Sequence, residues 1–311
     1  MPDRRGYREV LEGLARADDR IVVMTAENRA SIRDLPAALG VRFVDTGISE
    51  QTLVGAAAGL ALRGRIPVVH ALAAFLTMRA FEFIRTDVGL PDLPVKLFGG
   101  FPGILSTANG PTHQAVEDIA LMRAIPNMGI FCPADEEDLV LGLPEVLRSP
   151  RPFYVRLHHA DPAVAHRRDV AIGRAERIRE GAAATLLVAG VLLRQAIDAA
   201  ADLERRGWTA AVLNMRTVRP LDEEAVLQAA NDCPLLVTVE DHLVPGGLYS
   251  AVCELLIRRG AARTVLPVGL AGNGFTPCLL PGLLEREGFT GPRLADRIAR
   301  TLEAKGVPHD A

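Results

Sequence analysis

The chain has 311 residues and a formal net charge of −3, and 49% of its residues are hydrophobic against 23% charged. These values are typical of a globular protein that is long enough for two domains. The nearly balanced charge gives no electrostatic footprint for nucleic acid or an anionic membrane. The most hydrophobic region does not reach the length of a membrane span, because it is interrupted by Arg63, Arg65, Arg79 and Arg85. We therefore expect no nucleic-acid partner and no membrane partner.

The N-terminal segment and the cysteines indicate a cytoplasmic protein. The first residues lead into an amphipathic helical pattern (Tyr7, Val10, Leu11, Leu14) and not into a signal sequence. The cysteines are far apart, and none has a second cysteine or a histidine at ligand spacing: they are Cys132, Cys233, Cys253 and Cys278. We predict reduced core cysteines and no metal site on this chain.

Short β-branched runs alternate with helical patterns over the first half of the chain. The runs lie at residues 21–24, 43–44, 66–69, 95–98, 128–131 and 153–155. Strands that are separated by helices indicate a parallel sheet with both faces covered. Pro67 and Pro94 stand at the starts of strands, where a missing N–H is harmless.

A change of composition after residue 160 indicates a domain boundary. Residues 161–182 are rich in Arg, Ala and Asp, and a second alternating pattern follows them. Its predicted strands are 185–188, 211–213, 235–239 and 264–266, and its predicted helices are 195–206, 223–230 and 248–259. We therefore predict an α/β protein with two mainly parallel sheets flanked by helices: a first domain at 1–160, a linker at 161–182 and a second domain at 183–311.

The segment 45–51, Asp-Thr-Gly-Ile-Ser-Glu-Gln, places Glu50 between a short strand and a helix. The helix continues with Ala, Gly and Leu at nearly every position, so we expect both of its sides to be packed. Glu50 then lies in the first helical turn at the edge of a core. The helix dipole favours a carboxylate there, yet a partly buried carboxylate needs a hydrogen-bond partner. Glu50 is either a helix-capping residue or a functional acid.

A long Gly/Pro-rich loop after the predicted strand 95–98 contains a second candidate, His113. Ligands of parallel α/β sheets bind beyond the carboxyl ends of the strands. Thr112 is a suitable N-cap for a predicted helix at 115–123, which puts His113 at the helix N-terminus beside the crevice. There the dipole would favour a neutral imidazole. The alternative is a polar residue that merely starts the helix.

An aromatic ring and a histidine pair follow other strands. Phe75 comes after strand 66–69 and would lie at the same sheet edge as Glu50, or else it is a core residue. His158 and His159 are adjacent, so on extended chain they point in opposite directions and cannot bind one metal ion. The loop at 245–248, Pro-Gly-Gly-Leu, lacks the full dinucleotide-binding pattern and favours a tight turn. From the residues alone we infer a ligand-binding α/β protein.

Three ordered motifs resemble transketolases. They are the segment 45–51, then 110–114 (Gly-Pro-Thr-His-Gln), then 124–135 with Ala-Ile-Pro-Asn-Met and Cys-Pro-Ala-Asp. Residues 1 to about 160 are similar to the pyrimidine-binding domain. The remainder is similar to the transketolase C-terminal domain, through 216–222 and 237–242. The whole chain thus resembles the C-terminal subunit of a split transketolase.

The resemblance implies a thiamine diphosphate site. Glu50 would hydrogen-bond the aminopyrimidine ring and favour its imino tautomer, and the protein would supply positioning and electrostatics to cofactor chemistry. Phe75 would pack on the pyrimidine face, and Ile48 would also contact the cofactor. His113 would lie close to the reacting centre as a second catalytic residue.

The resemblance also implies a partner subunit. Transketolases bind the cofactor diphosphate through Mg²⁺ and a Gly-Asp-Gly motif in a separate domain, and this sequence contains no Gly-Asp-Gly. The chain would then hold half of a site, with Mg²⁺ held mainly by the partner. We expect an α₂β₂-like assembly and no activity from this chain alone.

The expected function is the transfer of a two-carbon ketol unit from a ketose donor to an acceptor. The substrate residues implied are His70, Phe101, Asn109 and His159. The last three depart from the family's His, Asp and Arg, and a neutral His159 would weaken phosphate binding because Arg pairs with phosphate in a charge-assisted, bidentate way. We therefore expect non-standard substrates. The alternatives are 1-deoxyxylulose-5-phosphate synthase, a 2-oxoacid dehydrogenase β subunit, or a non-catalytic scaffold.

Overall fold

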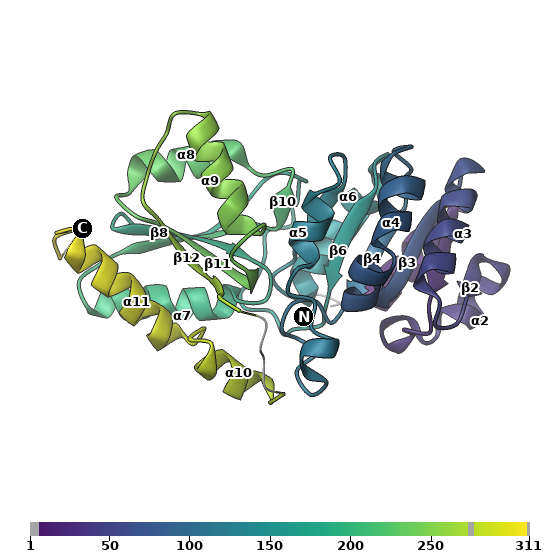
Figure 1. The fold of residues 1–311 in the computed structure, drawn as a ribbon, viewed down its shortest axis with the longest axis horizontal. Helices are drawn as coiled ribbons and strands as arrows, with labels where there is room; N and C mark the ends of the chain where they lie inside the picture. Colours follow the sequence, from purple (N-terminus) through teal and green to yellow (C-terminus); the bar gives the residue numbers. More distant parts are fainter. Residues whose placement is uncertain (1–5, 273–276, 310–311) are drawn as a thin grey trace.

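The computed structural model describes residues 6–272 and 277–309. Two mainly parallel sheets lie side by side, each between layers of helices, as Figure 1 shows. The predicted α/β class with two sheets is therefore confirmed. Over the described residues, no helix is long and apolar enough to cross a membrane.

The first sheet has seven strands in the order β10-β5-β6-β4-β3-β1-β2. Its strands are β1 Ile21–Thr25, β2 Phe43–Asp45, β3 Ile66–Leu72, β4 Lys96–Gly100, β5 Gly129–Phe131, β6 Phe153–Leu157 and β10 Thr217–Arg219. Its α-helices are α1 Tyr7–Ala17, α2 Leu35–Leu39, α3 Glu50–Leu62, α4 Phe81–Phe83, α5 Asp118–Arg123 and α6 Glu136–Arg148. Short 3₁₀ turns lie at η1 Ala30–Ile32, η2 Gly40–Arg42 and η5 Gly110–Thr112, and π-helical turns at η3 Phe75–Arg79 and η4 Ile84–Gly89.

The second sheet has five strands in the order β12-β11-β8-β9-β7. Its strands are β7 Glu176–Arg179, β8 Ala184–Ala189, β9 Ala210–Asn214, β11 Leu236–Leu243 and β12 Val265–Leu270. Its helices are α7 Leu193–Arg205, α8 Glu223–Asp232, α9 Leu248–Arg258, α10 Leu280–Arg286 and α11 Gly291–Ala304. In Figure 1, α8 and α9 lie on one side of this sheet, and α7 and α11 lie on the other.

The two faces of the first sheet bury alternate residues of each strand, as the two-residue period of a strand requires. In β1, Val22 and Met24 join the core under α3 and α5, whereas Ile21 and Val23 join the core under α1 and α6. Because both faces are covered, the strand is apolar throughout and ends on the buried Thr25.

Within this chain, helix α3 is packed on one side only, and we expected packing on both. Leu53, Val54 and Ala57 are buried against the sheet, but Ala56 and Gly59 are exposed within this chain. Small side chains allow a helix to lie close to its neighbours on any side. They do not supply a neighbour on the second side.

Two strands cross the domain boundary that the sequence suggested. β7 lies inside the expected linker 161–182 and pairs antiparallel with β9 at the edge of the second sheet. β10, from the second half of the chain, pairs antiparallel with β5 and completes the first sheet. Both pairings are long-range, so the local hydrophobic pattern carries no sign of them.

Candidate active site

The carboxyl ends of the parallel strands of the first sheet meet at one edge, which we call the carboxyl edge. Glu50 follows β2, Phe75 follows β3, Phe101 follows β4 and His159 follows β6. Because β2, β1, β3, β4 and β6 are neighbours and parallel, the chain delivers these residues to the same side of the molecule. A crevice beyond this edge is the usual ligand site of an open α/β sheet.

Glu50 is a buried acid at this edge. It is the first residue of α3, after the N-cap Ser49, and only 2% of its surface is exposed. Its Oε2 accepts a hydrogen bond from Nη1 of Arg79 at 2.9 Å. The ion pair compensates the carboxylate for its loss of water. Glu50 is thus buried in the first turn, as predicted. Its hydrogen-bond partner, Arg79, was not predicted from the sequence.

Arg79 also joins Glu50 to the aromatic residues. Its guanidinium carbon lies 4.5 Å from the centroid of the Phe75 ring, in a cation–π contact. The His113 ring meets the same Phe75 ring edge-on, with centroids 5.1 Å apart. Glu50, Arg79, Phe75 and His113 therefore form one group, which we call the Glu50 cluster.

The Glu50 cluster is built on an irregular helix. Phe75 and Arg79 bound the π-helical turn η3, and π turns occur frequently at functional sites. The sequence could have indicated that Arg79 lies beside Phe75. Arg79 comes four residues later, and residues four apart on a helix lie on the same face. Otherwise, in the sequence alone, Arg79 is noticeable only as a charge that interrupts an apolar run.

His113 does not stand at a helix N-terminus, which corrects the prediction. The 3₁₀ turn Gly110–Thr112 precedes it, and α5 begins only at Asp118, with Glu117 as its N-cap. Ala115 pairs with Gly103 in an antiparallel bridge, so its backbone is not available for the helix. A helix dipole therefore gives no reason to expect a neutral imidazole. The Nδ1 atom of His113 shares a hydrogen bond with the Thr112 hydroxyl at 2.8 Å.

The other residues implied for cofactor and substrate are mostly exposed. Ile48 is 70% exposed two residues before Glu50, and Phe101 is 47% exposed in a left-handed conformation (φ 53°) directly after β4. Asn109 is exposed and donates to the Ser106 hydroxyl at 3.4 Å. All three lie on loops at the carboxyl edge.

His159 lies in a pocket of about 530 Å³ between α1, η1 and α6. Its Nε2 shares a hydrogen bond with the Ser31 hydroxyl at 2.6 Å, and its Nδ1 lies 3.1 Å from Oε1 of Glu136. Arg8 and Arg33 also line the pocket. Arg8 contacts three carboxylates, whereas Arg33 makes no ion pair with any described residue.

His70 is fully buried, so its implied contact with substrate finds no support. One ring nitrogen meets the Tyr7 hydroxyl at 2.7 Å, and the ring stacks on Phe98 with centroids 5.3 Å apart. Burial lowers the pKa of His70 to about 4. The neutral imidazole of His70 connects β3 to α1 through a hydrogen bond with Tyr7, which is a structural role in the core.

A buried group of acids and a histidine has the donor set of a metal site. Ligand atoms of Asp138, His166 and Glu176 lie within 4.8 Å of one another. Nη2 of Arg216 contacts Glu176 at 2.5 Å and Asp138 at 3.1 Å, so a guanidinium already supplies the positive charge. We interpret the group as an ion-pair network.

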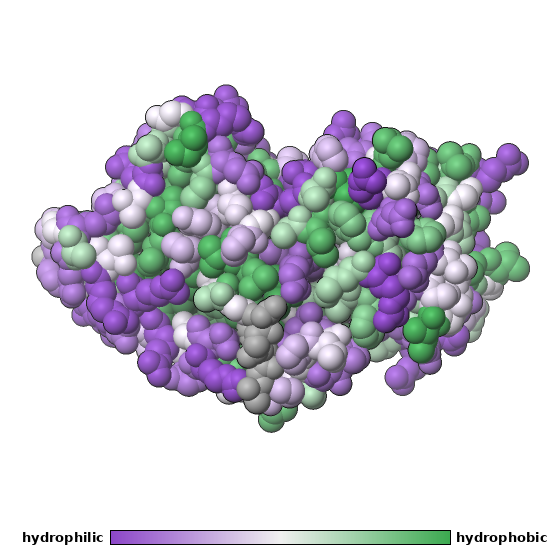
Figure 2. Space-filling view, viewed as in Figure 1, coloured by the Kyte–Doolittle hydropathy of each residue, from purple (hydrophilic) through white to green (hydrophobic). Residues whose placement is uncertain are grey.

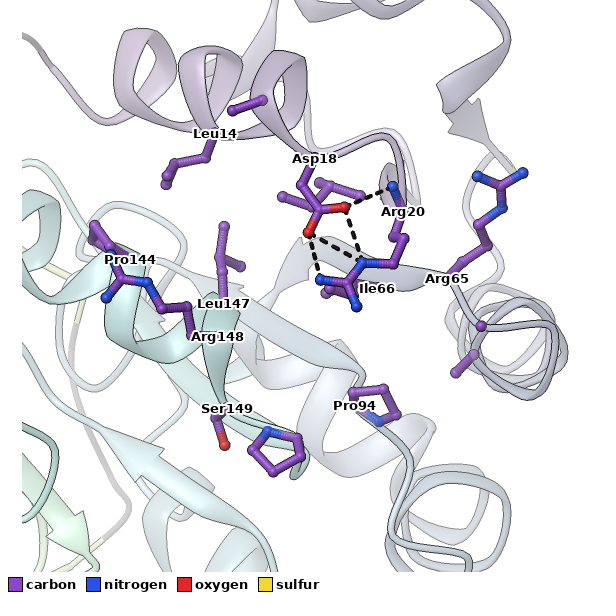
Figure 3. Close-up of a pocket in the computed structure, with 15 residues that line it drawn as sticks. Leu14, Asp18, Arg20, Arg65, Ile66, Pro94, Pro144, Leu147, Arg148 and Ser149 are labelled. Atoms are coloured by element: carbon purple, nitrogen blue, oxygen red, sulfur yellow. Dashed lines mark hydrogen bonds and ion pairs between the residues drawn. The ribbon is translucent and has the colours of Figure 1, made fainter.

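A further pocket, of about 460 Å³, lies at the opposite edge of the first sheet (Figure 3). Ile21 and Ile66, the first residues of β1 and β3, form part of its wall. Arg20, at its rim, is held by Asp18 through several hydrogen bonds. None of the residues implied for cofactor or substrate lines this pocket, so we do not place the active site there.

Comparison with known families decides the classification. Residues 2–162 match the transketolase pyrimidine binding domain, and residues 173–281 match the transketolase C-terminal domain. This chain belongs to the transketolase family. Membership implies dependence on thiamine diphosphate, and the Glu50 cluster fits that cofactor because it offers a buried acid beside an aromatic face.

Several transketolase relatives match most of the chain. The 6-deoxy-6-sulfo-D-fructose transketolase subunit SqwH of Clostridium sp. (strain MSTE9) is 38% identical, over 97% of this chain and 95% of that protein. A subunit of the apulose-4-phosphate transketolase of Actinobacillus succinogenes is 33% identical over 82% of each chain. The 1-deoxy-D-xylulose-5-phosphate synthase of Thermomicrobium roseum is 37% identical, but the match spans only 48% of that protein.

A solved structure agrees with the split-subunit relationship. The structure titled "Split gene transketolase, inactive beta4 tetramer" superposes with a TM-score of 0.87 and 34% identity, over 96% of this chain and 97% of that one. The chain is thus a transketolase-family subunit that is homologous to split transketolases. The sequence-based identification of the family is confirmed.

Proposed function

We propose that this chain is one subunit of a thiamine-diphosphate-dependent transketolase that transfers a two-carbon ketol unit from a ketose donor to an aldehyde acceptor. The observation that carries the proposal is the Glu50 cluster, in which a 2% exposed carboxylate lies beside Phe75 and His113 at the carboxyl edge. Burial of a charged side chain costs free energy, which favours a functional role for Glu50 over a scaffold.

Thiamine diphosphate, when bound, supplies the carbon nucleophile that accepts the two-carbon unit. Glu50 would share a proton with a ring nitrogen of the aminopyrimidine through a carboxylate oxygen. Phe75 would pack against the pyrimidine ring, and Ile48 would contact it from the loop before α3. His113 would exchange a proton with substrate oxygen atoms through a ring nitrogen. Arg79 would hold the Glu50 carboxylate in place.

We infer that a partner subunit completes the site. Two relatives that match over most of their own length are named as transketolase subunits, and the sequence lacks a Gly-Asp-Gly motif for the diphosphate and Mg²⁺. Ile48, Met78 and Phe101 expose hydrophobic surface near the Glu50 cluster. Figure 2 shows hydrophobic side chains among polar ones on the face formed by α4 and α5. A pyrophosphate-domain subunit in an α₂β₂ assembly would cover such surface.

We infer that the substrate is a sugar with an anionic terminal group. The Arg33 guanidinium, Ser31 and His159 line one pocket at the carboxyl edge, and Arg33 lacks an ion-pair partner among the described residues. The replacement of an arginine by His159 predicts weak anion binding, but Arg33 brings a cation from another element. Two of the relatives are named for a sulfonated sugar and a sugar phosphate. Either anion could accept hydrogen bonds from the side chains of this pocket.

The test is turnover by the chain assembled with its partner. We expect transfer of a two-carbon unit from ketose donors. E50Q should lose at least about 99% of this activity, because an amide cannot share a proton with the ring as a carboxylate does. The control is E303Q, which changes an exposed carboxylate on α11, away from the face proposed for the partner, and should leave turnover unchanged. Carbon dioxide release from pyruvate would instead favour the synthase alternative, and full activity of E50Q would favour a scaffold.

A further inference from the structure

The loop that carries His113 is closed at its base by a short backbone bridge. The Gly103 amide donates to the Ala115 carbonyl at 2.9 Å, and the Ala115 amide donates back at 3.1 Å. Residues 103–115, which we call the His113 lobe, therefore leave and return to the protein at one point. The orientation of His113 depends on how that base is held.

The base of the lobe rests on the end of β11, in the second domain. A Cβ atom on Gly103 (φ 56°) would lie 1.9 Å from Oδ2 of Asp241, so the contact requires glycine. The next two residues of β11 continue the contact: the Leu243 amide donates to the Val116 carbonyl at 2.9 Å, and the Ala120 amide donates to Nε2 of His242 at 3.2 Å. Figure 1 shows β11 ending beside α5.

A buried ion-pair triad connects the same strand to the helix that follows the lobe. Arg156 on β6 donates to both oxygens of Asp118 at 2.9 and 3.0 Å, and its Nη1 donates to Oδ1 of Asp241 at 2.5 Å. The three side chains are at most 2% exposed. Asp118 also accepts from the Tyr154 hydroxyl at 2.6 Å. One guanidinium thus joins two carboxylates from two domains.

The motif 240–242, Glu-Asp-His, takes no part in the Glu50 cluster. Glu240 accepts from the Leu248 and Tyr249 amides and orders the turn into α9. Asp241 and His242 make their contacts in the other direction, toward the lobe and α5. No described atom of Asp241 contacts the Glu50 cluster, so any effect on catalysis passes through the lobe.

We propose that Asp241 is a positioning residue for His113: with Arg156, it fixes the base of the His113 lobe and keeps the imidazole beside Phe75. This inference rests on the proposed function, in which His113 acts on substrate. It gives the second domain a part in the reaction. Loss of the Asp241 charge would free the base of the lobe while leaving Glu50, Arg79 and Phe75 in place.

The experiment compares D241N with wild type in the assembled complex. Hydrogen–deuterium exchange should become at least about tenfold faster for amides of residues 104–117. The affinity for thiamine diphosphate should stay within twofold, because Glu50 and Phe75 are untouched. The kcat of D241N should be about tenfold lower than that of wild type. The kcat of the double variant D241N/H113A should equal that of H113A. D222N is the control, since Asp222 caps α8 far from the lobe.

The outcomes separate this inference from the proposed function. Unchanged exchange over 104–117, or additive losses in D241N/H113A, would overturn the positioning role. Full activity of H113A would contradict the proposed function, and the exchange measurement would still decide whether Asp241 holds the lobe. If D241N does not fold, R156K replaces it: lysine keeps the charge but loses the two-pronged contact with Asp118, and should give the same pattern.

Discussion

Glu50 is a nearly fully buried carboxylate, and Arg79 pairs with it directly. An ion-paired carboxylate still has a free oxygen lone pair for a second donor, because each carboxylate accepts about four hydrogen bonds. The cation–π contact with Phe75 restrains Arg79 in turn. The charged and aromatic parts of the proposed cofactor site therefore support each other.

Arg33 provides a prediction at the scale of a single side chain. R33A should raise the KM for donors with a terminal phosphate or sulfonate about tenfold, since a lost charge-assisted contact costs about 1.4 kcal/mol. The KM for an uncharged ketose and the kcat should change little. Steady-state assays with matched charged and uncharged donors make the measurement.

R65A is the matched control for Arg33, because Arg65 lines the pocket at the opposite edge of the sheet. It should leave both KM values as in wild type. An equal rise of KM for charged and uncharged donors in R33A would remove the pocket from substrate recognition.

At the scale of elements, local sequence patterns predicted most helices and strands but not all their ends. The alternation of β-branched runs and helical patterns located both sheets, because central strands such as β1, β4 and β8 are buried on both faces. The helix after His113 begins three residues later than predicted, because the Gly103–Ala115 bridge takes the backbone that the helix would use.

Tertiary pairing was harder to predict than the elements themselves. β7 and β10 were not predicted as they occur, because each adds a short strand to an edge by antiparallel pairing with a distant segment. The candidate site shows the same division: Glu50, Phe75 and His113 were proposed from motifs, whereas Arg79 and Arg33 were identified only by the residues they face in the structure.

Two buried ion-pair networks join the domains of the whole molecule. One contains Arg156, and the other contains His166, which contacts Asp135 of the first domain at 2.8 Å and Glu176 of β7 at 2.6 Å. Burial by itself disfavours the charged imidazolium, but the hydrogen bonds to the two carboxylates outweigh it and raise the pKa of His166 to about 10. Asp138 and Arg216 complete the network.

The raised pKa of His166 makes the stability of the molecule depend on pH. A group whose pKa is higher in the folded state stabilises fully below its unfolded pKa, about 6.5, and loses the effect as pH rises through about 10. H166Q should therefore lower the free energy of unfolding by on the order of 3 kcal/mol at pH 6 and by much less at pH 10.

Chemical denaturation of H166Q and wild type at each pH measures this difference, and the subtraction cancels groups that both proteins share. H309Q, at an exposed histidine, is the control and should show a small, constant difference. If H166Q lowers the free energy of unfolding by the same amount from pH 6 to pH 10, the imidazole is neutral in the folded protein.

Proton exchange tests the proposed action of Glu50 on the aminopyrimidine ring without a substrate. In the complex assembled with the partner subunit, the C2 proton of bound thiamine diphosphate exchanges with deuterium at a rate that reports this action. We predict that E50Q slows the exchange at least about 100-fold, with the cofactor still bound, and that E303Q, on the exposed side of α11, leaves it unchanged. Exchange at the wild-type rate in E50Q would mean that Glu50 does not act on the ring.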